Sequence, residues 1–206
     1  MPPLLQRAFA GLALLVLAGC VEGVTVPNGS SNFIVVSDFA VPEGAVHLDR
    51  SFGFSLYRGE PGVPVQQRAA SVGRAVAFLV TDTIVDRLRA RGYDATSATK
   101  PASPDYRALI VSGTFRAIDE GARRRVGNEH SAVIAQVDIK ATLGNGTMQN
   151  VQSFAVDSRT APPAPPQSGA TGRETGVDAD AAKVGAEIAR VVAEVARRNN
   201  WVPAAR

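Results

Sequence analysis

Cysteine is nearly absent from this chain, since its 206 residues contain only Cys20. A single cysteine excludes an intrachain disulfide and every zinc site built from several cysteines. Histidine is almost as rare, with His47 and His130 alone, and two histidines without a His-x-x-x-His spacing argue against a metal centre. We therefore expect no metal and no cofactor.

Two other features are missing: a long hydrophobic run and an excess of charge. The apolar stretch Ala8–Ala18 has 11 residues, whereas a membrane-spanning helix needs about 20. The net charge is only +3, from 22 basic and 19 acidic residues, so we expect no nucleic-acid partner. Apolar residues make up 45% of the chain, as in globular proteins.

The N-terminus has the pattern of an export signal. Arg7 precedes the apolar stretch, and small residues follow it up to Cys20, which is typical of a secretory signal peptide. The segment Leu17–Cys20, "LAGC", matches the bacterial lipobox at all four positions. An ordinary signal peptide with an incidental cysteine is the alternative.

The resemblance to a lipobox implies a lipoprotein. Residues 1–19 would be the signal peptide and 20–31 a lipidated tether, with Cys20 carrying a diacylglycerol thioether and an N-terminal acyl group such as palmitate. Several acyl chains hold a protein stably at a membrane, whereas one does not. Val21, rather than Asp, follows the cysteine, which implies the outer membrane of a bacterium, on its periplasmic face.

Residues 32–202 are expected to form a single globular domain, which is a suitable length for one core. Apolar periodicity predicts strands and two amphipathic helices in the order β-α-β-β-β-α. The proline-rich stretch "APPAPP" predicts a stiff connector within residues 161–176, and we expect a side chain near Asp178 to cap the second helix. The predicted strands are Asn32–Val41, Arg107–Asp119, His130–Leu143 and Thr147–Asp157, with a possible short one at Tyr93–Thr96, and the helices run through Pro64–Arg91 and Val177–Val195.

This order predicts an α+β fold with a single mixed, mostly antiparallel sheet. The first link would be a parallel crossover and the rest an antiparallel meander, with both helices packed on one face. Residues 42–63, which are rich in glycine and proline, are predicted to be a loop.

The lipobox, "FIVVSDF", a long helix and "LIVSGTFRAIDEGARRRVG" together resemble a known lipoprotein group, the bacterial family designated domain of unknown function 4410. The most specific part is Gly113–Gly127, although Asn128–Ser131 departs from the family pattern. The resemblance implies a fold and a localisation, and it supplies no catalytic residues.

A hydrolase would require the neighbours Asp119, His130 and Ser131 to act together. The chain has no Gly-x-Ser-x-Gly elbow, and adjacent strand residues point to opposite faces, so we expect no enzyme. Asp38 and Asp119 both end apolar strands and could face each other if those strands are neighbours, but paired carboxylates act as acid and base only in a cleft that shifts their pKa values.

Two segments are candidate interaction sites. The first, Ser51–Gly59, contains Phe52, Phe54 and Tyr57; these form an exposed apolar patch unless the segment folds back as an edge strand of the core. The second, Arg123, Arg124 and Arg125, suits phosphate or anionic headgroups, or else forms a solvated turn.

The sequence therefore favours a membrane-anchored, periplasm-facing lipoprotein that acts as a non-catalytic accessory or interaction module of the cell envelope. Its partners would be the membrane, through the lipid on Cys20, and another envelope protein. The alternative is a carrier of a small apolar ligand or lipid that assists a transporter, which requires an apolar pocket of roughly 300–1,000 Å³. The oligomeric state is not readable from the sequence.

Overall fold

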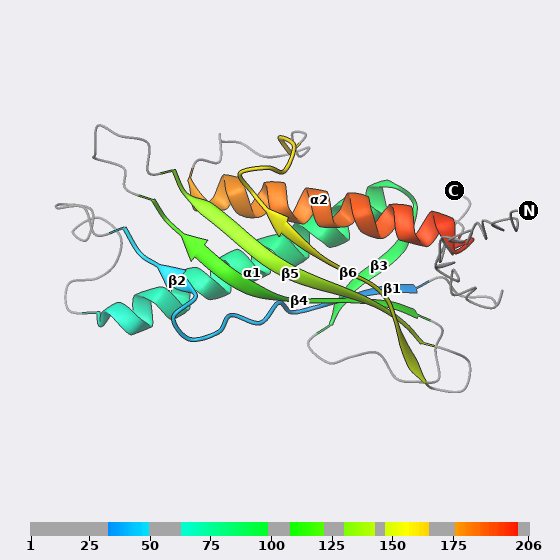
Figure 1. The fold of residues 1–206 in the computed structure, drawn as a ribbon, viewed down its shortest axis with the longest axis horizontal. Coiled ribbons are helices and arrows are strands. Elements are labelled where there is room, and N and C mark those ends of the chain that lie inside the picture. Colours follow the sequence, from blue (N-terminus) through cyan, green and yellow to red (C-terminus); the bar gives the residue numbers. More distant parts are fainter. Residues whose placement is uncertain are drawn as a thin grey trace, which may run out of the picture.

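The computed structural model describes residues 33–49, 63–98, 108–121, 130–142, 147–164 and 176–201. Within these ranges the chain forms one sheet and two long helices (Figure 1). In chain order the elements are β1 (Phe33–Ser37), β2 (Val46–His47), α1 (Val65–Ala90), β3 (Asp94–Ala98), β4 (Ala108–Asp119), β5 (Ala132–Thr142), β6 (Met148–Asp157) and α2 (Val177–Arg198).

The sheet is mixed, with the order β3-β1-β4-β5-β6, and β2 pairs with the far end of β4. β1 pairs in parallel with both β3 and β4, whereas β4, β5 and β6 form an antiparallel meander. Helix α1 supplies the long crossover connection that parallel pairing of β1 with β3 requires.

β1 is apolar on both faces because both are covered. Ile34 and Val36 are fully buried in the main core, and Val35 is buried on the opposite face with Ala108 and Ile110. A strand buried on both faces reads as a continuous apolar run rather than an alternating one, which explains the sequence "FIVV".

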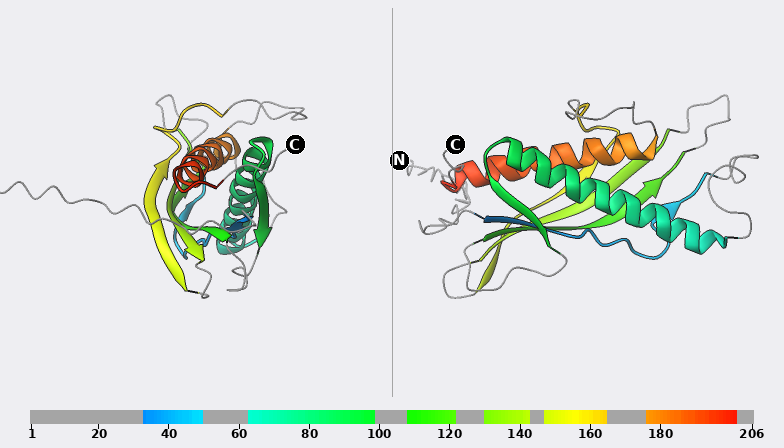
Figure 2. Two further views of the ribbon diagram at one scale, coloured as in Figure 1. Left: turned by 90° about the vertical axis from the view of Figure 1, so that its right-hand side faces the viewer. Right: turned by 180° about the vertical axis from the view of Figure 1, so that it is seen from behind.

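Both helices lie on the same face of the sheet, as the view along the long axis shows (Figure 2). Each helix sends one apolar stripe into the main core, including Val80, Ile84 and Leu88 from α1 and Val184 and Ile188 from α2. The sheet supplies the alternate residues of β4 and β5 to the same core, as amphipathic layers require.

The predicted α+β class, with one mixed sheet and two helices, is confirmed. The predicted element order is wrong, because β2 lies within the segment predicted to be a loop and β3 is a full five-residue strand. Of the five strand pairs, three are parallel and two antiparallel, although the antiparallel pairs join the longest strands. The meander begins at β4, because β3 pairs with β1 instead.

The predicted cap of the second helix is also wrong. Gly176 occupies the N-cap position, with φ 71°, and no side chain caps the helix. Asp178 and Asp180 lie in the first turn instead, where a carboxylate is favoured by the partial positive charge of the helix N-terminus.

The strand directions give the molecule two distinct ends (Figures 1 and 2). We name the first the Phe33 end; it contains the start of β1 and the last turns of α1 and α2. We name the other the Glu120 end; it contains β2, the end of β4, the start of β5 and the first turns of both helices.

Candidate functional site

The residues selected from the sequence as interaction or lipidation sites lie outside the described residues: Cys20, Phe52, Phe54, Tyr57, Arg123, Arg124 and Arg125. Most of the proline-rich connector also lies outside them. The structure does, however, place the residues that flank both candidate interaction segments. Asp49 lies two residues before Ser51, and Gly121 lies two residues before Arg123.

The flanks of the two segments are joined at the Glu120 end. β2 pairs with the end of β4, Val46 with Ile118 and His47 with Asp119. The backbone N–H of Glu120 donates to the carbonyl of His47 at 3.0 Å. The Glu120 carboxylate in turn accepts the backbone N–H of Asp49 at 3.1 Å.

Both acidic residues at this junction are buried, with Asp49 6% and Glu120 8% exposed. Buried carboxylates are kept only where they are hydrogen-bonded or paired, so this link is a built feature rather than a chance surface contact. It fixes the starting points of the segments that follow, which are 71 residues apart in sequence.

A pocket of about 590 Å³ lies beside this junction, between the chain leading to β2 and the first three turns of α1. Its lining is mostly apolar, with Glu43, Gln66 and Arg74 as the polar residues. The apolar and small residues that line it are Val41, Pro42, Gly44, Val46, Val65, Ala69 and Ala70.

Two glycines allow the wall of the pocket to approach its neighbours. A Cβ on Gly73 of α1 would lie 2.8 Å from Cγ1 of Val41, closer than a methyl group tolerates. Gly113 of β4 lies directly beneath the ring of Phe39, and that ring packs against Phe115 with centroids 5.7 Å apart. The chain from β1 to β2 is thus packed onto the edge of β4 and onto α1.

The first turn of α2 completes the Glu120 end. The Asp180 side chain is buried and accepts a hydrogen bond from the Ser131 hydroxyl at 2.6 Å. Its other oxygen pairs with the Lys183 ammonium at 2.9 Å. The start of β5 is fixed further by the Val133 N–H, which donates to the Ser158 hydroxyl at 3.0 Å.

The possible hydrolase group is not assembled within the described residues. The Ser131 hydroxyl donates to Asp180 rather than to a histidine, and His130 is exposed. Asp119 accepts the backbone N–H of Gly121 at 2.8 Å, which is a turn-forming role. Among the described residues, the hydrogen-bond partner of the Ser131 hydroxyl is thus the Asp180 carboxylate, not the predicted His130.

The idea that Asp38 and Asp119 face each other is wrong, even though β1 and β4 are neighbours. Ala40 pairs with Thr114, which places Asp38 near Ser112. Asp119 lies seven residues further along β4, roughly 20 Å away at the usual rise of a strand. Within the described ranges, no three His, Cys, Asp or Glu side chains are grouped so as to hold a metal ion.

Sequence reasoning missed Asp49, Glu120, Asp180 and the apolar pocket. No short-range pattern indicates that Asp49 meets Glu120, because β2 has only two residues. Trp201, which follows α2, is buried in the main core and is 4% exposed. No helix in the described part of the chain is long and apolar enough to cross a membrane.

Comparisons with known proteins find only distant structural matches. No family model matches the chain, and no curated protein matches it. Three solved structures with low similarity are a PelC dodecamer from Paraburkholderia phytofirmans, a Helicobacter pylori homologue of the neuraminyllactose-binding hemagglutinin, and the hypothetical protein CT253 from Chlamydia trachomatis.

The PelC structure is 15% identical, with a TM-score of 0.37, and the match covers 77% of this chain and 83% of that one. The Helicobacter structure is 10% identical, with a TM-score of 0.39 and coverage of 87% and 93%. The Chlamydia structure is 10% identical, with a TM-score of 0.30 and coverage of 85% and 100%. Values this low assign neither a family nor an activity.

Proposed function

We propose that this protein is a lipid-anchored, non-catalytic module of the bacterial envelope that binds a partner protein with its Glu120 end. The anchor would be Cys20, within the lipobox sequence "LAGC". The binding surface would be formed by the two segments that leave the Glu120 end, one with Phe52, Phe54 and Tyr57 and the other with Arg123, Arg124 and Arg125.

One observation carries the proposal: the flanks of these two segments are tied together. The Asp49–Glu120 hydrogen bond and the pairing of β2 with β4 bring their starting points side by side. Aromatic residues and arginines are the residue types most enriched at the centres of protein interfaces. Two such segments starting from one place favour a single composite surface over two unrelated loops.

The placement of the chain entry also supports the proposal. β1 begins at the Phe33 end, so the tether reaches the domain opposite to the joined flanks (Figure 1). A lipid on the tether would confine the domain to the membrane surface and raise its effective concentration for membrane-bound partners. The Glu120 end would remain accessible to them.

Photo-crosslinking in living cells tests this function. A photoreactive residue is placed at Phe54 or at Arg124 of the lipidated protein, and a matched control carries it at Arg89, which is exposed at the other end. We expect the same crosslinked protein from Phe54 and Arg124, and none of it from Arg89. Clean monomer at both test positions, with the protein present at the membrane, would overturn the proposal.

The pocket favours a second candidate, a carrier of a small apolar ligand. Its volume of about 590 Å³ lies within the usual range for ligand sites, and its lining is mostly apolar.

Native mass spectrometry after mild detergent extraction tests whether the protein is a carrier. A carrier retains a bound apolar molecule, and the variant Ala69→Phe, which fills the pocket, loses it. The control Ala75→Phe places the same ring on an exposed position of α1 and retains the molecule; empty wild-type protein excludes the carrier.

A further inference from the structure

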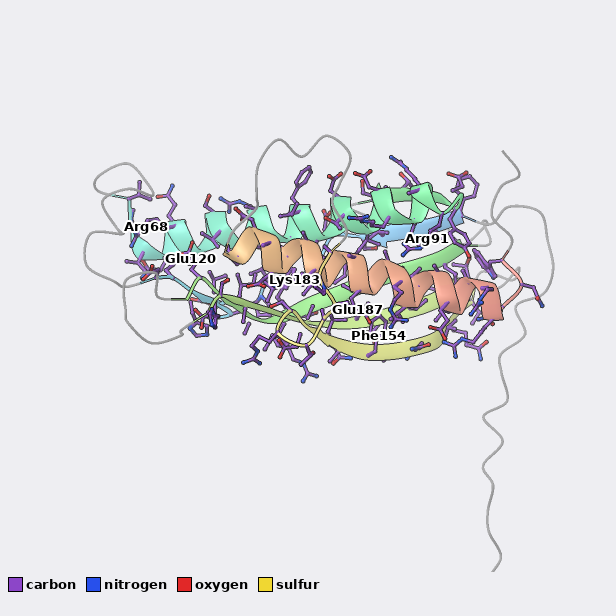
Figure 3. All side chains as sticks on the ribbon, turned by 90° about the horizontal axis from the view of Figure 1, so that it is seen from above. Arg68, Arg91, Glu120, Phe154, Lys183 and Glu187 are labelled. Atoms are coloured by element: carbon purple, nitrogen blue, oxygen red, sulfur yellow. The ribbon has the colours of Figure 1, made fainter. Side chains whose placement is uncertain are left out.

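Arginines gather at the Phe33 end of the molecule. Helices α1 and α2 both end there, and each carries cations in its last turns (Figure 3, where Arg91 marks this end). Cations are favoured at helix C-termini, and because the two helices end together, their cations form one surface. We name it the basic surface; its arginines are Arg87, Arg89, Arg91, Arg190, Arg197 and Arg198.

The opposite end has the opposite character among the described residues. Its cations are Arg68, Arg74, Arg116, Arg159 and Lys183, and Figure 3 shows Arg68 and Glu120 at this end. Its acidic residues outnumber them by a small margin: Glu43, Asp49, Asp119, Glu120, Asp157, Asp178 and Asp180. At the Phe33 end the acidic residues are Asp86, Asp94, Glu187 and Glu194, against six arginines. Charge is therefore separated along the axis that leads from the chain entry to the joined flanks.

The basic surface has a shallow, open depression. A pocket of about 340 Å³ lies between the two helix ends, lined by Arg91, Tyr93, Arg190, Ala193, Glu194 and Arg197. The Tyr93 hydroxyl donates to the carbonyl of Ala193 at 3.3 Å. This bond ties the end of α1 to α2 and holds Arg91 and Arg197 around one concave site.

The guanidinium groups of this pocket are not equally engaged. Arg190 binds both oxygens of Glu187, at 2.9 and 2.7 Å, and this hydrogen bonding raises the pKa of Arg190. Among the described residues, the Arg91 guanidinium donates to the backbone carbonyl of Arg87, at 3.1 Å. Within the described residues, neither Arg91 nor Arg197 forms an ion pair, so both retain donors for an external anion.

The chain enters beside this pocket. Phe33, the first residue of β1, pairs with Asp94 of β3, three residues after Arg91. Twelve residues, 21–32, separate Cys20 from Phe33, and an extended chain of that length spans at most about 40 Å. A lipid on Cys20 therefore keeps the basic surface close to the bilayer.

We propose that the basic surface binds the phosphates of anionic phospholipid headgroups, with Arg91 and Arg197 as the principal contacts. This inference deepens the proposed function and rests on its membrane location. The planar guanidinium fork matches phosphate oxygens in a bidentate geometry, and the negative potential of an anionic bilayer attracts basic surfaces over about one Debye length. The domain then stands on the membrane with its Glu120 end directed away.

Vesicle co-sedimentation of the Cys20→Ser chain, which cannot be acylated, tests the inference apart from the anchor. We expect binding to vesicles of phosphatidylcholine with one quarter phosphatidylglycerol, no binding to phosphatidylcholine alone, and loss of binding at high salt. The double variant Arg91→Glu/Arg197→Glu should weaken binding by about tenfold or more. The control Arg116→Glu/Arg159→Glu makes the same change in net charge at other exposed positions and should keep most of the binding.

Three outcomes would overturn the inference: no binding to anionic vesicles by a folded protein, equal losses in both double variants, or tight binding of inorganic phosphate without vesicle binding. The last would assign the pocket to free phosphate. Circular dichroism melting of each variant shows that it is folded. Because crosslinking at Phe54 reports on the other end of the molecule, failure of the partner proposal and failure of this one are distinguishable.

Discussion

Gly185 of α2 packs directly against Thr83 of α1. A Cβ built on Gly185 would lie 2.8 Å from Cβ of Thr83 and 3.0 Å from the carbonyl oxygen of Val80. Cβ atoms do not approach other heavy atoms so closely without displacing them. The two helices are therefore nearer at this point than any larger residue at position 185 would allow, and the glycine is a packing requirement.

We predict that Gly185→Ala destabilises the protein by about 1–2 kcal/mol, because overpacking typically costs 1–3 kcal/mol and exceeds the helix propensity that alanine gains. Urea unfolding followed by circular dichroism measures the change. The control Ala186→Gly, one residue along α2, reports the propensity alone and should cost about 1 kcal/mol. A gain in stability for Gly185→Ala would show that the helices accommodate an extra methyl group at this contact.

Thr83 supports a second prediction of the opposite sign. Its side chain is fully buried, and its hydroxyl has no hydrogen-bond partner within the described part of the chain. An unsatisfied buried hydroxyl costs about 1–3 kcal/mol, and valine has almost the same shape. We expect Thr83→Val to raise the free energy of unfolding by about 1 kcal/mol, measured in the same urea titration. A clear decrease in the free energy of unfolding would show that the Thr83 hydroxyl has a hydrogen-bond partner in solution.

At the Glu120 end, Glu120→Ala should loosen the junction of the two candidate segments. The variant leaves the buried N–H of Asp49 without its acceptor, and a buried unpaired donor costs about 1–3 kcal/mol. Hydrogen exchange should accelerate at residues 45–49, while the amides of β1 keep their protection. Glu120→Gln retains an acceptor and serves as the control. Unchanged exchange in Glu120→Ala would mean that β2 is held without this carboxylate.

The end of β6 carries a pH-dependent ion pair. The hydrogen bond from the Arg159 guanidinium lowers the pKa of Asp157 below its usual value of 3.8; the pair is 2.6 Å long. Because folding lowers the pKa of Asp157, its ion pair with Arg159 stabilises the folded state above pH 4. This stabilisation is lost as the pH falls through the lowered pKa.

We therefore expect the stability difference between wild type and Arg159→Gln to be greatest at neutral pH and to vanish well below pH 3.8. A carbon-13 NMR titration of the Asp157 carboxyl should show its pKa rising toward its usual value in the variant, which keeps only the backbone hydrogen bond of residue 159. Arg159 is largely exposed, with 60% of its side chain accessible, so the effect should shrink in high salt. If the pKa of Asp157 is the same in the variant as in the wild type, the ion pair with Arg159 is not what lowers it.

Much of the fold is local enough to be read from the sequence. Helix α1 was predicted within one residue at each end because its apolar spacing is long and regular, with Gly92 after it in the left-handed conformation at φ 85°. The strands β4, β5 and β6 were predicted to within two residues at each end, β4 from its long apolar segment, β5 from its alternation and β6 as the strand that returns from β5. In a long periodic segment, a few residues that depart from the hydrophobic pattern do not obscure it.

What the sequence did not predict depends on long-range pairing. β2 has two residues and exists only because β4 extends beyond its pairing with β1 and offers an edge to Val46 and His47. The link between Asp49 and Glu120 follows from that register. The apolar pocket likewise requires Gly73 to bring α1 against Val41, a contact across more than 30 residues of intervening chain.

The position of β1 has a mechanical consequence. β1 is hydrogen-bonded on both sides, to β3 and to β4, and its first residue is where the chain enters the domain. A pull applied through residues before Phe33 acts along the strand, across the slanted hydrogen bonds of two parallel ladders. Both ladders must then shear at once rather than open one bond at a time. When the domain is pulled by its N-terminus, β1 carries the greatest load. The domain resists unfolding by force at this strand.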